Sequence, residues 1–330
     1  MLNIFSKYSY HTIVISFSIV VYLFSLTTVH KEQLPSQMND MIEGKYLKPY
    51  VYRTLLPTTV RCIYSCIPED VKNNWTDFVC NIPKVLSVLE LLNWPKELSL
   101  KLFIASVFVI LFYIGFGYTI SEFIFLFIQS GNKYILKSII SGISLILLPG
   151  FFRYGFHLYD APQLFLFTLA IYLLYRGKFG LFYVVYILAV INKETSVLLA
   201  LIFVVYYFKK IPSGKLIWLF VLFVFTFILV KTFLLFVFEK NGGSFLEYHY
   251  LENNLRSVLA LVMNSGFLIL LLCLSLYKWK YKPIFLKTSF LIVALPLIIS
   301  TIFFGIFDEI RVYYELYPML ITLSVISFKI

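Results

Sequence analysis

The chain has 330 residues, of which 60% are hydrophobic and 14% are charged, whereas a soluble domain carries about 25% charged residues. This composition excludes an ordinary soluble domain and indicates a membrane protein built from apolar helices. The formal net charge of +11 would favour nucleic acid as the partner of a soluble protein. Here the bases lie in short loops between apolar runs, so we interpret them as topology signals and expect no nucleic acid.

A helix needs about 20 apolar residues to cross the roughly 30 Å hydrocarbon core of a bilayer. By this criterion the first span covers residues 11–29, and a long outer loop follows over residues 30–100. Two apolar pieces of that loop, 54–67 and 82–92, are too short to cross, and we expect amphipathic helices lying at the membrane interface. The remaining spans are predicted at residues 102–128, 136–151, 162–175, 181–191, 196–207, 216–238, 258–277, 290–306 and 319–328.

The predicted fold class is therefore all-α: a single integral membrane domain over residues 1–330 with about ten transmembrane helices. Residues 192–194 could be the tip of a hairpin or the charged middle of one long helix. Arg176 precedes this pair of spans and Lys210 follows it. A hairpin puts both bases on the inner side, as the positive-inside rule requires, so we favour the hairpin. Both termini are then predicted to be cytoplasmic.

The acids support this topology. Of the 17 Asp and Glu residues, we place only Glu122 in an inner half and the other 16 on the outer side. Because the bases alone were used to choose the topology, the acids are a partly independent check. The inner loops are short and contain no phosphate-cradling glycine loop, which argues against a nucleotide as cofactor or donor. Chemistry is therefore expected on the outer side.

The first candidate site residues follow the first span. Asp40 and Glu43 are three residues apart, so a helical turn would put both on one side. Close carboxylates can raise the pKa of one another so that one serves as a base, or they can hold a divalent metal ion. They could equally be ordinary surface acids. Arg53 could clamp a phosphate with its planar fork, or simply snorkel at the interface.

A second candidate group is Arg153, His157 and Asp160, spaced i, i+4 and i+7. On a helix these side chains would form one stripe that could bind an anion and move a proton. Alternatively, Arg153 and Asp160 only neutralise each other. Asp160 is the more informative residue, because it stands at the mouth of a span and acids are costly at membrane depth.

Two further groups complete the set. Lys193 and Glu194 lie at the tip of the predicted hairpin, whose arms of about 12 residues are too short to bring the tip to the outer surface. We therefore expect both side chains to be paired or functional. Glu309, Arg311 and Glu315 stand among several tyrosines near the last span. They could form a local ion-pair ladder, or a sugar site in which flat rings accompany hydroxyl acceptors.

At these residues the chain resembles the polytopic membrane glycosyltransferases of the GT-C type, which take a sugar from a polyprenyl-phosphate carrier on the outer side. An acid in the first outer loop, an amphipathic segment and many helices make up the shared layout. Four short motifs are also similar to those of bacterial multi-span proteins grouped with that type: Tyr-Arg-Thr-Leu-Leu-Pro (52–57), Tyr-Asp-Ala-Pro (159–162), Asn-Lys-Glu-Thr (192–195) and Glu-Ile-Arg-Val-Tyr-Tyr-Glu-Leu-Tyr-Pro (309–318).

The resemblance implies an inverting transferase that moves a sugar from a polyprenyl-phosphate donor to a glycan or lipid acceptor of the cell envelope. Asp40 would be the base or a metal-side carboxylate, with Asp160 and Glu194 as alternatives, because the family often has two adjacent acids where this chain has Asn39 and Asp40. Arg53, Arg153 or Arg311 would stabilise the departing phosphate, and a divalent metal could take part. Two alternatives remain open: a transporter or flippase of a lipid-linked glycan, and an O-antigen polymerase-like enzyme.

Overall fold

The computed structural model describes residues 2–27, 32–128, 132–152, 155–244, 266–304 and 310–328. Over these ranges the chain forms helices joined by loops, which confirms the predicted all-α class for this part of the chain. The α-helices are α1 (Leu2–Leu26), α2 (Leu34–Glu43), α3 (Leu55–Cys66), α4 (Glu69–Asn81), α5 (Pro83–Leu91), α6 (Ser99–Phe125), α7 (Lys133–Ile146), α8 (Asp160–Tyr175), α9 (Phe179–Asn192), α10 (Leu198–Tyr207), α11 (Ser213–Val237), α13 (Gly266–Leu276), α14 (Ile284–Phe304) and α15 (Tyr317–Ser327). Six short 3-10 helices join them: η1 (Tyr50–Tyr52), η2 (Lys96–Leu98), η3 (Leu148–Phe151), η4 (Glu194–Val197), η5 (Trp279–Tyr281) and η6 (Ile310–Leu316).

Five helical segments of the described chain are long and apolar enough to cross a membrane, as a membrane protein requires: 6–26, 96–125, 133–151, 213–237 and 284–304. Three other predicted spans correspond to α8, α9 and η4–α10, which are apolar but shorter. The predicted span 258–277 lies partly outside the described residues, and the last one corresponds to the 11-residue α15. The count of about ten crossings therefore remains a prediction.

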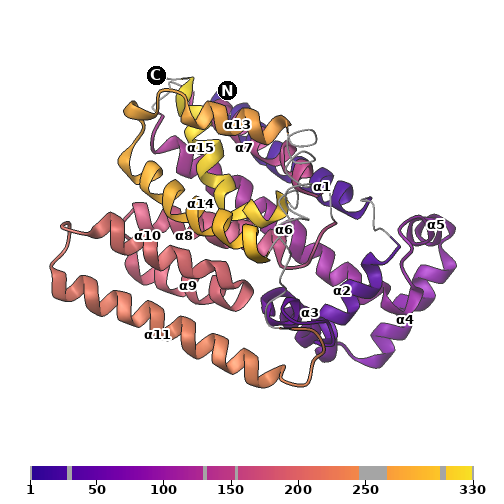
Figure 1. Ribbon diagram of the computed structural model, residues 1–330. Coiled ribbons are helices and arrows are strands. Elements are labelled where there is room, and N and C mark those ends of the chain that lie inside the picture. Colours follow the sequence, from indigo (N-terminus) through magenta and orange to yellow (C-terminus); the bar gives the residue numbers. More distant parts are fainter. Residues whose placement is uncertain are drawn as a thin grey trace.

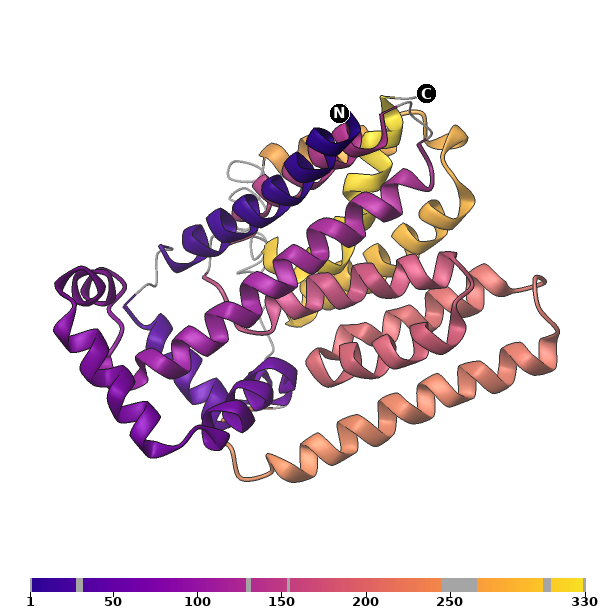
Figure 2. The ribbon, with the colours of Figure 1, turned by 180° about the vertical axis from the view of Figure 1, so that it is seen from behind.

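The helices form an elongated bundle with α8 and α15 among its most buried members (Figures 1 and 2). α6 packs on α8 and α7, α8 packs on α9, and α1 packs on α7 and α6. α11 lies along one edge, against α9 and α10, and buries few of its side chains. The helices α2–α5 gather at one end of the bundle, and both chain ends lie at the other.

Local sequence explains where the smaller helices begin and end. Pro35 stands in the first turn of α2, where a missing N–H costs nothing. Gly44 ends α2 with φ +70°, and the N–H groups of Gly44 and Lys45 return to the carbonyls of Met41 and Asp40. The two helices predicted within 54–67 and 82–92 are present as α3 and α5, whereas α2 and α4 were not predicted.

α9 and α10 form the predicted hairpin. The ring of Phe179, the first residue of α9, lies 4.9 Å from that of Tyr207, the last residue of α10, and 5.6 Å from that of Phe203 (centroid distances). The two helices therefore run antiparallel, with the residues around Glu194 at the turn between them. The alternative of one long helix with a charged middle is wrong.

Candidate functional site

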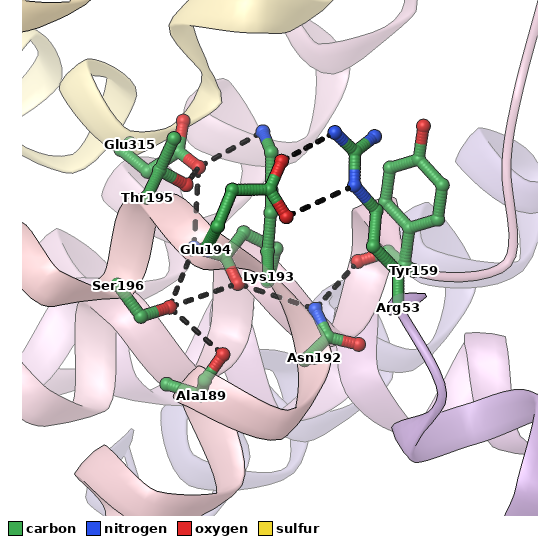
Figure 3. A network of polar contacts seen from close by, with 10 residues as sticks. Arg53, Tyr159, Ala189, Asn192, Lys193, Glu194, Thr195, Ser196 and Glu315 are labelled. Carbon is green, nitrogen blue, oxygen red and sulfur yellow. Dashed lines mark hydrogen bonds and ion pairs between the residues drawn. The ribbon is translucent and has the colours of Figure 1, made fainter. Parts of the chain in front are cut away.

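A group of charged side chains lies where α8, α9 and α10 meet, at the turn of the hairpin (Figure 3). At 1.5 Å per residue, these helices are about 24, 21 and 15 Å long, less than the roughly 30 Å core of a bilayer. α11 is longer: its Lys231 interacts electrostatically with Glu194, and the helix continues beyond this level to Val237. We refer to six side chains as the charged cluster: Arg53, Asp160, Lys193, Glu194, Arg311 and Glu315.

The Arg53 guanidinium and the Glu194 carboxylate form the outer pair of the cluster. Nη2 of Arg53 lies 2.5 Å from Oε1 of Glu194, and Nε donates to Oε2 at 3.4 Å. The guanidinium carbon also lies 4.4 Å from the centre of the Tyr159 ring. The Glu194 side chain is 41% exposed, against 12% for Arg53. This pair can therefore be reached from the surface.

The neighbouring residue, Lys193, forms a second and buried pair. Its Nζ lies 2.9 Å from Oε1 of Glu315, and the two side chains are 7% and 0% exposed. The same carboxylate oxygen accepts hydrogen bonds from the Thr195 hydroxyl and from Nε2 of Gln163. Figure 3 shows the adjacent residues Lys193 and Glu194 paired with different partners. The local ladder between Arg311 and Glu315 is therefore absent, because Glu315 pairs with Lys193 instead.

Polar side chains fix the turn of the hairpin to α8. Nδ2 of Asn192 donates to the Tyr159 carbonyl at 3.0 Å and to Oε1 of Gln163 at 3.2 Å. The Ser196 hydroxyl donates to the Ala189 carbonyl at 2.8 Å. All three side chains, Asn192, Gln163 and Ser196, are at most 1% exposed. These bonds set the positions of Lys193 and Glu194 relative to Asp160.

Asp160 differs from the other two carboxylates of the cluster. The side chain is 1% exposed, and Oδ2 accepts a hydrogen bond from the His157 backbone N–H at 2.9 Å. Among the described residues, Oδ1 has no hydrogen-bond partner and neither oxygen belongs to an ion pair. Arg311 and Lys193 act on it electrostatically without such a contact. A proton acceptor needs an available oxygen, and Asp160 has one.

The predicted stripe on one helix is wrong for this segment. Residues 155–157 are not helical, and α8 begins only at Asp160, with Pro162 in its first turn. His157 instead lies among the rings of Tyr46, Tyr50 and Tyr159, with the nearest centroid at 5.1 Å. Burial, together with the nearby Arg311 and Arg53, holds the pKa of His157 well below its usual value. These surroundings disfavour the charged form of the ring.

The residues on either side of Arg53 contact α11 and α9, and these contacts hold Arg53 in place. Val51 and Tyr52 of η1 pack against Leu234 and Phe238 at the end of α11. The N–H of Thr54 donates to the carbonyl of Ile191 in α9 at 3.4 Å. The segment before η1 is tied down as well, because Nδ2 of Asn241 donates to the carbonyls of Gly44 and Tyr46, and the N–H of Lys48 donates to Gly242.

Gly243 allows this close contact, and its replacement should loosen it. Its φ is +89°, and a Cβ there would lie 2.7 Å from the carbonyl oxygen and 3.0 Å from the nitrogen of Lys48. Gly243→Ala should therefore destabilise the protein by about 1–3 kcal/mol and increase trypsin cleavage after Lys45, which lies in the same segment and is followed by Tyr46. Gly242→Ala is the matched control, since its Cβ would meet only Cδ2 of Leu47, at 3.4 Å. Equal behaviour of the two variants would contradict this explanation.

Asp40 and Glu43 lie apart from the charged cluster. Nζ of Lys101 in α6 binds Oε1 of Glu43 at 2.6 Å and Oδ1 of Asn39 at 3.1 Å. This hydrogen bond from Lys101 holds the pKa of Glu43 below its usual value. Tyr113, which interacts electrostatically with Asp160, lies three turns further along α6 than Lys101, about 18 Å along the helix axis. Asp40 and Asp160 thus lie near different positions along the axis of α6.

Two predicted residues, Arg153 and Glu309, lie outside the described part of the chain. Within it, no group of three His, Cys, Asp or Glu side chains is placed to hold a metal ion. Gln163 and Lys231 were not predicted as site residues, and Thr195 was predicted only as part of the Asn-Lys-Glu-Thr motif. Lys231 had a usable signal, because it is the one charged residue between positions 216 and 238 of an otherwise apolar run.

Comparison with known proteins identifies no relative of this chain. The chain matches no protein-family model, no curated protein and no solved structure.

Proposed function

We propose that the protein is a membrane glycosyltransferase that moves a sugar from a polyprenyl-phosphate carrier to a glycan or lipid acceptor on the outer side of the membrane. The observation that carries the proposal is the position of Asp160. This carboxylate has an available oxygen and lies within electrostatic reach of Arg311, Lys193 and Arg53. A base beside several cations suits a reaction that deprotonates a hydroxyl and releases a phosphate.

In this mechanism Asp160 takes the place that the sequence analysis gave first to Asp40. The carboxylate accepts the proton of the acceptor hydroxyl as the hydroxyl oxygen attacks the anomeric carbon of the donor sugar. The bond between that carbon and the phosphate oxygen breaks, and the configuration inverts. The departing polyprenyl phosphate carries the negative charge, which Arg53 or Arg311 stabilises.

The membrane topology is part of the proposal. About ten segments would cross the bacterial inner membrane, with both termini in the cytoplasm and the charged cluster facing the outer side. Since α8, α9 and α10 are short, the cluster would lie below the outer surface, where an unpaired charge is costly. The ion pairs of Arg53 and Lys193 fit such an environment.

Cysteine labelling of intact cells tests this topology. Single cysteines at positions 178 and 212, in a chain otherwise free of cysteine, should resist a reagent that cannot cross the membrane. Cys62, restored alone, should be labelled, because it is exposed in α3 near the proposed outer end. If position 178 or 212 were labelled and Cys62 were protected, the protein would have the opposite orientation in the membrane.

The accumulated intermediate tests the function. Cells that lack the protein should accumulate a polyprenyl-phosphate-linked monosaccharide, and its level should return to normal when the wild-type chain is restored. Accumulation of a complete lipid-linked glycan on the inner side would instead support the transporter. The same glycan trapped unpolymerised on the outer side would support the polymerase-like enzyme.

A further inference from the structure

Three buried polar groups near the charged cluster have hydrogen-bonding capacity that the described residues do not use. They are the hydroxyl of Tyr113 in α6, Oδ1 of Asp160 at the start of α8, and the hydroxyl of Tyr314 in η6. Their side chains are only 1%, 1% and 2% exposed. A buried polar group without a partner is destabilising, so three such groups together indicate that they share a binding partner.

The three groups lie on elements that pack against one another. α6 packs on α8, and α8 packs on η6. Each of the three pairs, Tyr113 with Asp160, Tyr314 with Asp160 and Tyr314 with Tyr113, is close enough for an electrostatic interaction. The ring of Phe151 stacks on that of Tyr314, with centroids 5.0 Å apart. This stacking restricts the position of the Tyr314 ring.

Nearby tyrosines show that an unused hydroxyl is not the rule in this core. The hydroxyl of Tyr317, three residues after Tyr314, donates to the Ser144 carbonyl at 2.6 Å. The hydroxyl of Tyr186 in α9 donates to the Phe223 carbonyl at 3.1 Å. Both side chains are completely buried. Tyr113 and Tyr314 therefore differ from comparable tyrosines, and both interact electrostatically with Asp160, which has an available oxygen.

We propose that Asp160, Tyr113 and Tyr314 form the subsite for one hydroxyl group, that of the acceptor alcohol, with a water molecule taking its place when no acceptor is bound. The set matches this chemistry: a carboxylate oxygen accepts the hydroxyl proton, and two phenols donate to the hydroxyl oxygen. The assignment rests on the proposed transferase function. In this assignment the three groups bind the acceptor, and Arg53 binds the phosphate of the donor.

A double-mutant cycle tests the subsite without any need for activity. Two hydroxyls that share one bound group should show coupled effects on stability, whereas independent sites are additive. Tyr113→Phe and Tyr314→Phe should each lower the unfolding midpoint, and the double variant should lose less than the sum. Tyr186→Phe combined with Tyr113→Phe is the control, and these two changes should be additive.

Kinetics then distinguish the acceptor from water. With a polyprenyl-phosphate-sugar donor and a simple alkyl glycoside as the acceptor probe, both Phe variants should raise the acceptor KM at least tenfold and leave the donor KM unchanged. Coupled stability with an unchanged acceptor KM would show a structural water only and overturn the acceptor assignment. Additive gains in stability in both Phe variants would overturn the subsite itself. Absence of transfer by the wild type would reject the proposed function, while the stability cycle would still decide whether the three groups hold one hydroxyl.

Discussion

Glu315→Gln should strongly destabilise the protein, because it leaves the Lys193 ammonium buried without its carboxylate. The Lys193 and Glu315 side chains are 7% and 0% exposed. Removing one partner of a buried ion pair typically costs about 3–5 kcal/mol, since the remaining charge is uncompensated. Titration with SDS in mixed micelles, followed by the loss of tertiary structure, measures the change in unfolding free energy.

The double replacement Lys193→Met and Glu315→Leu tests whether the loss of stability comes from the unpaired charge of Lys193. Two apolar side chains of similar volume remove both charges at once, so most of the stability should return. Glu69→Gln is the control, because the Glu69 side chain is 80% exposed in its pair with Lys72 and exposed pairs contribute little. A Glu315→Gln protein as stable as the Glu69→Gln control would contradict the buried pair.

Asp160→Asn should abolish sugar transfer while preserving the fold. The amide has the shape of the carboxylate and can still accept the hydrogen bond from the His157 N–H, but it cannot take up a proton. Loss of a general base lowers the rate by about 10²–10⁴-fold. Sugar release from a polyprenyl-phosphate donor in liposomes is the measurement, with the KM of the donor determined in parallel and expected to change little.

Asp40→Asn is the matched control for this experiment. The two replacements are chemically identical, but Asp40 lies on α2, at the level of Lys101, and not in the charged cluster. The Asp40→Asn protein should therefore retain nearly full activity. Activity lost in Asp40→Asn and kept in Asp160→Asn would return the base to the first outer loop, as the sequence analysis first assigned it.

The long helices could be predicted because hydrophobicity is a local property of the chain. The runs that became α6 and α11 are apolar over more than 18 residues, which is sufficient for the assignment. The hairpin of α9 and α10 could be predicted from the bases at both of its ends. The 3-10 turn at η4 and the late start of α8 depend on tertiary hydrogen bonds, such as that from Asn192 to Tyr159, which the local sequence does not reveal.

The pairing of charges could not be predicted. Arg53 and Glu194 are 141 positions apart, and the sequence is compatible with many other pairings of its acids and bases. Local spacing suggested Arg311 as the partner of Glu315, but η6 is a short 3-10 helix and Glu315 points to the hairpin turn instead. Tyr113 and Tyr314 gave no signal, because tyrosine is common throughout this apolar chain.

Reconstitution of the purified protein tests the central claim most directly. Liposomes containing the wild-type chain, a polyprenyl-phosphate donor with a labelled sugar, and an envelope glycan or lipid acceptor should yield labelled acceptor with inverted anomeric configuration and free polyprenyl phosphate. The Asp160→Asn protein should yield neither product. A label that stays on its lipid carrier and crosses the bilayer in a protein-dependent way would contradict the transferase and identify a transporter.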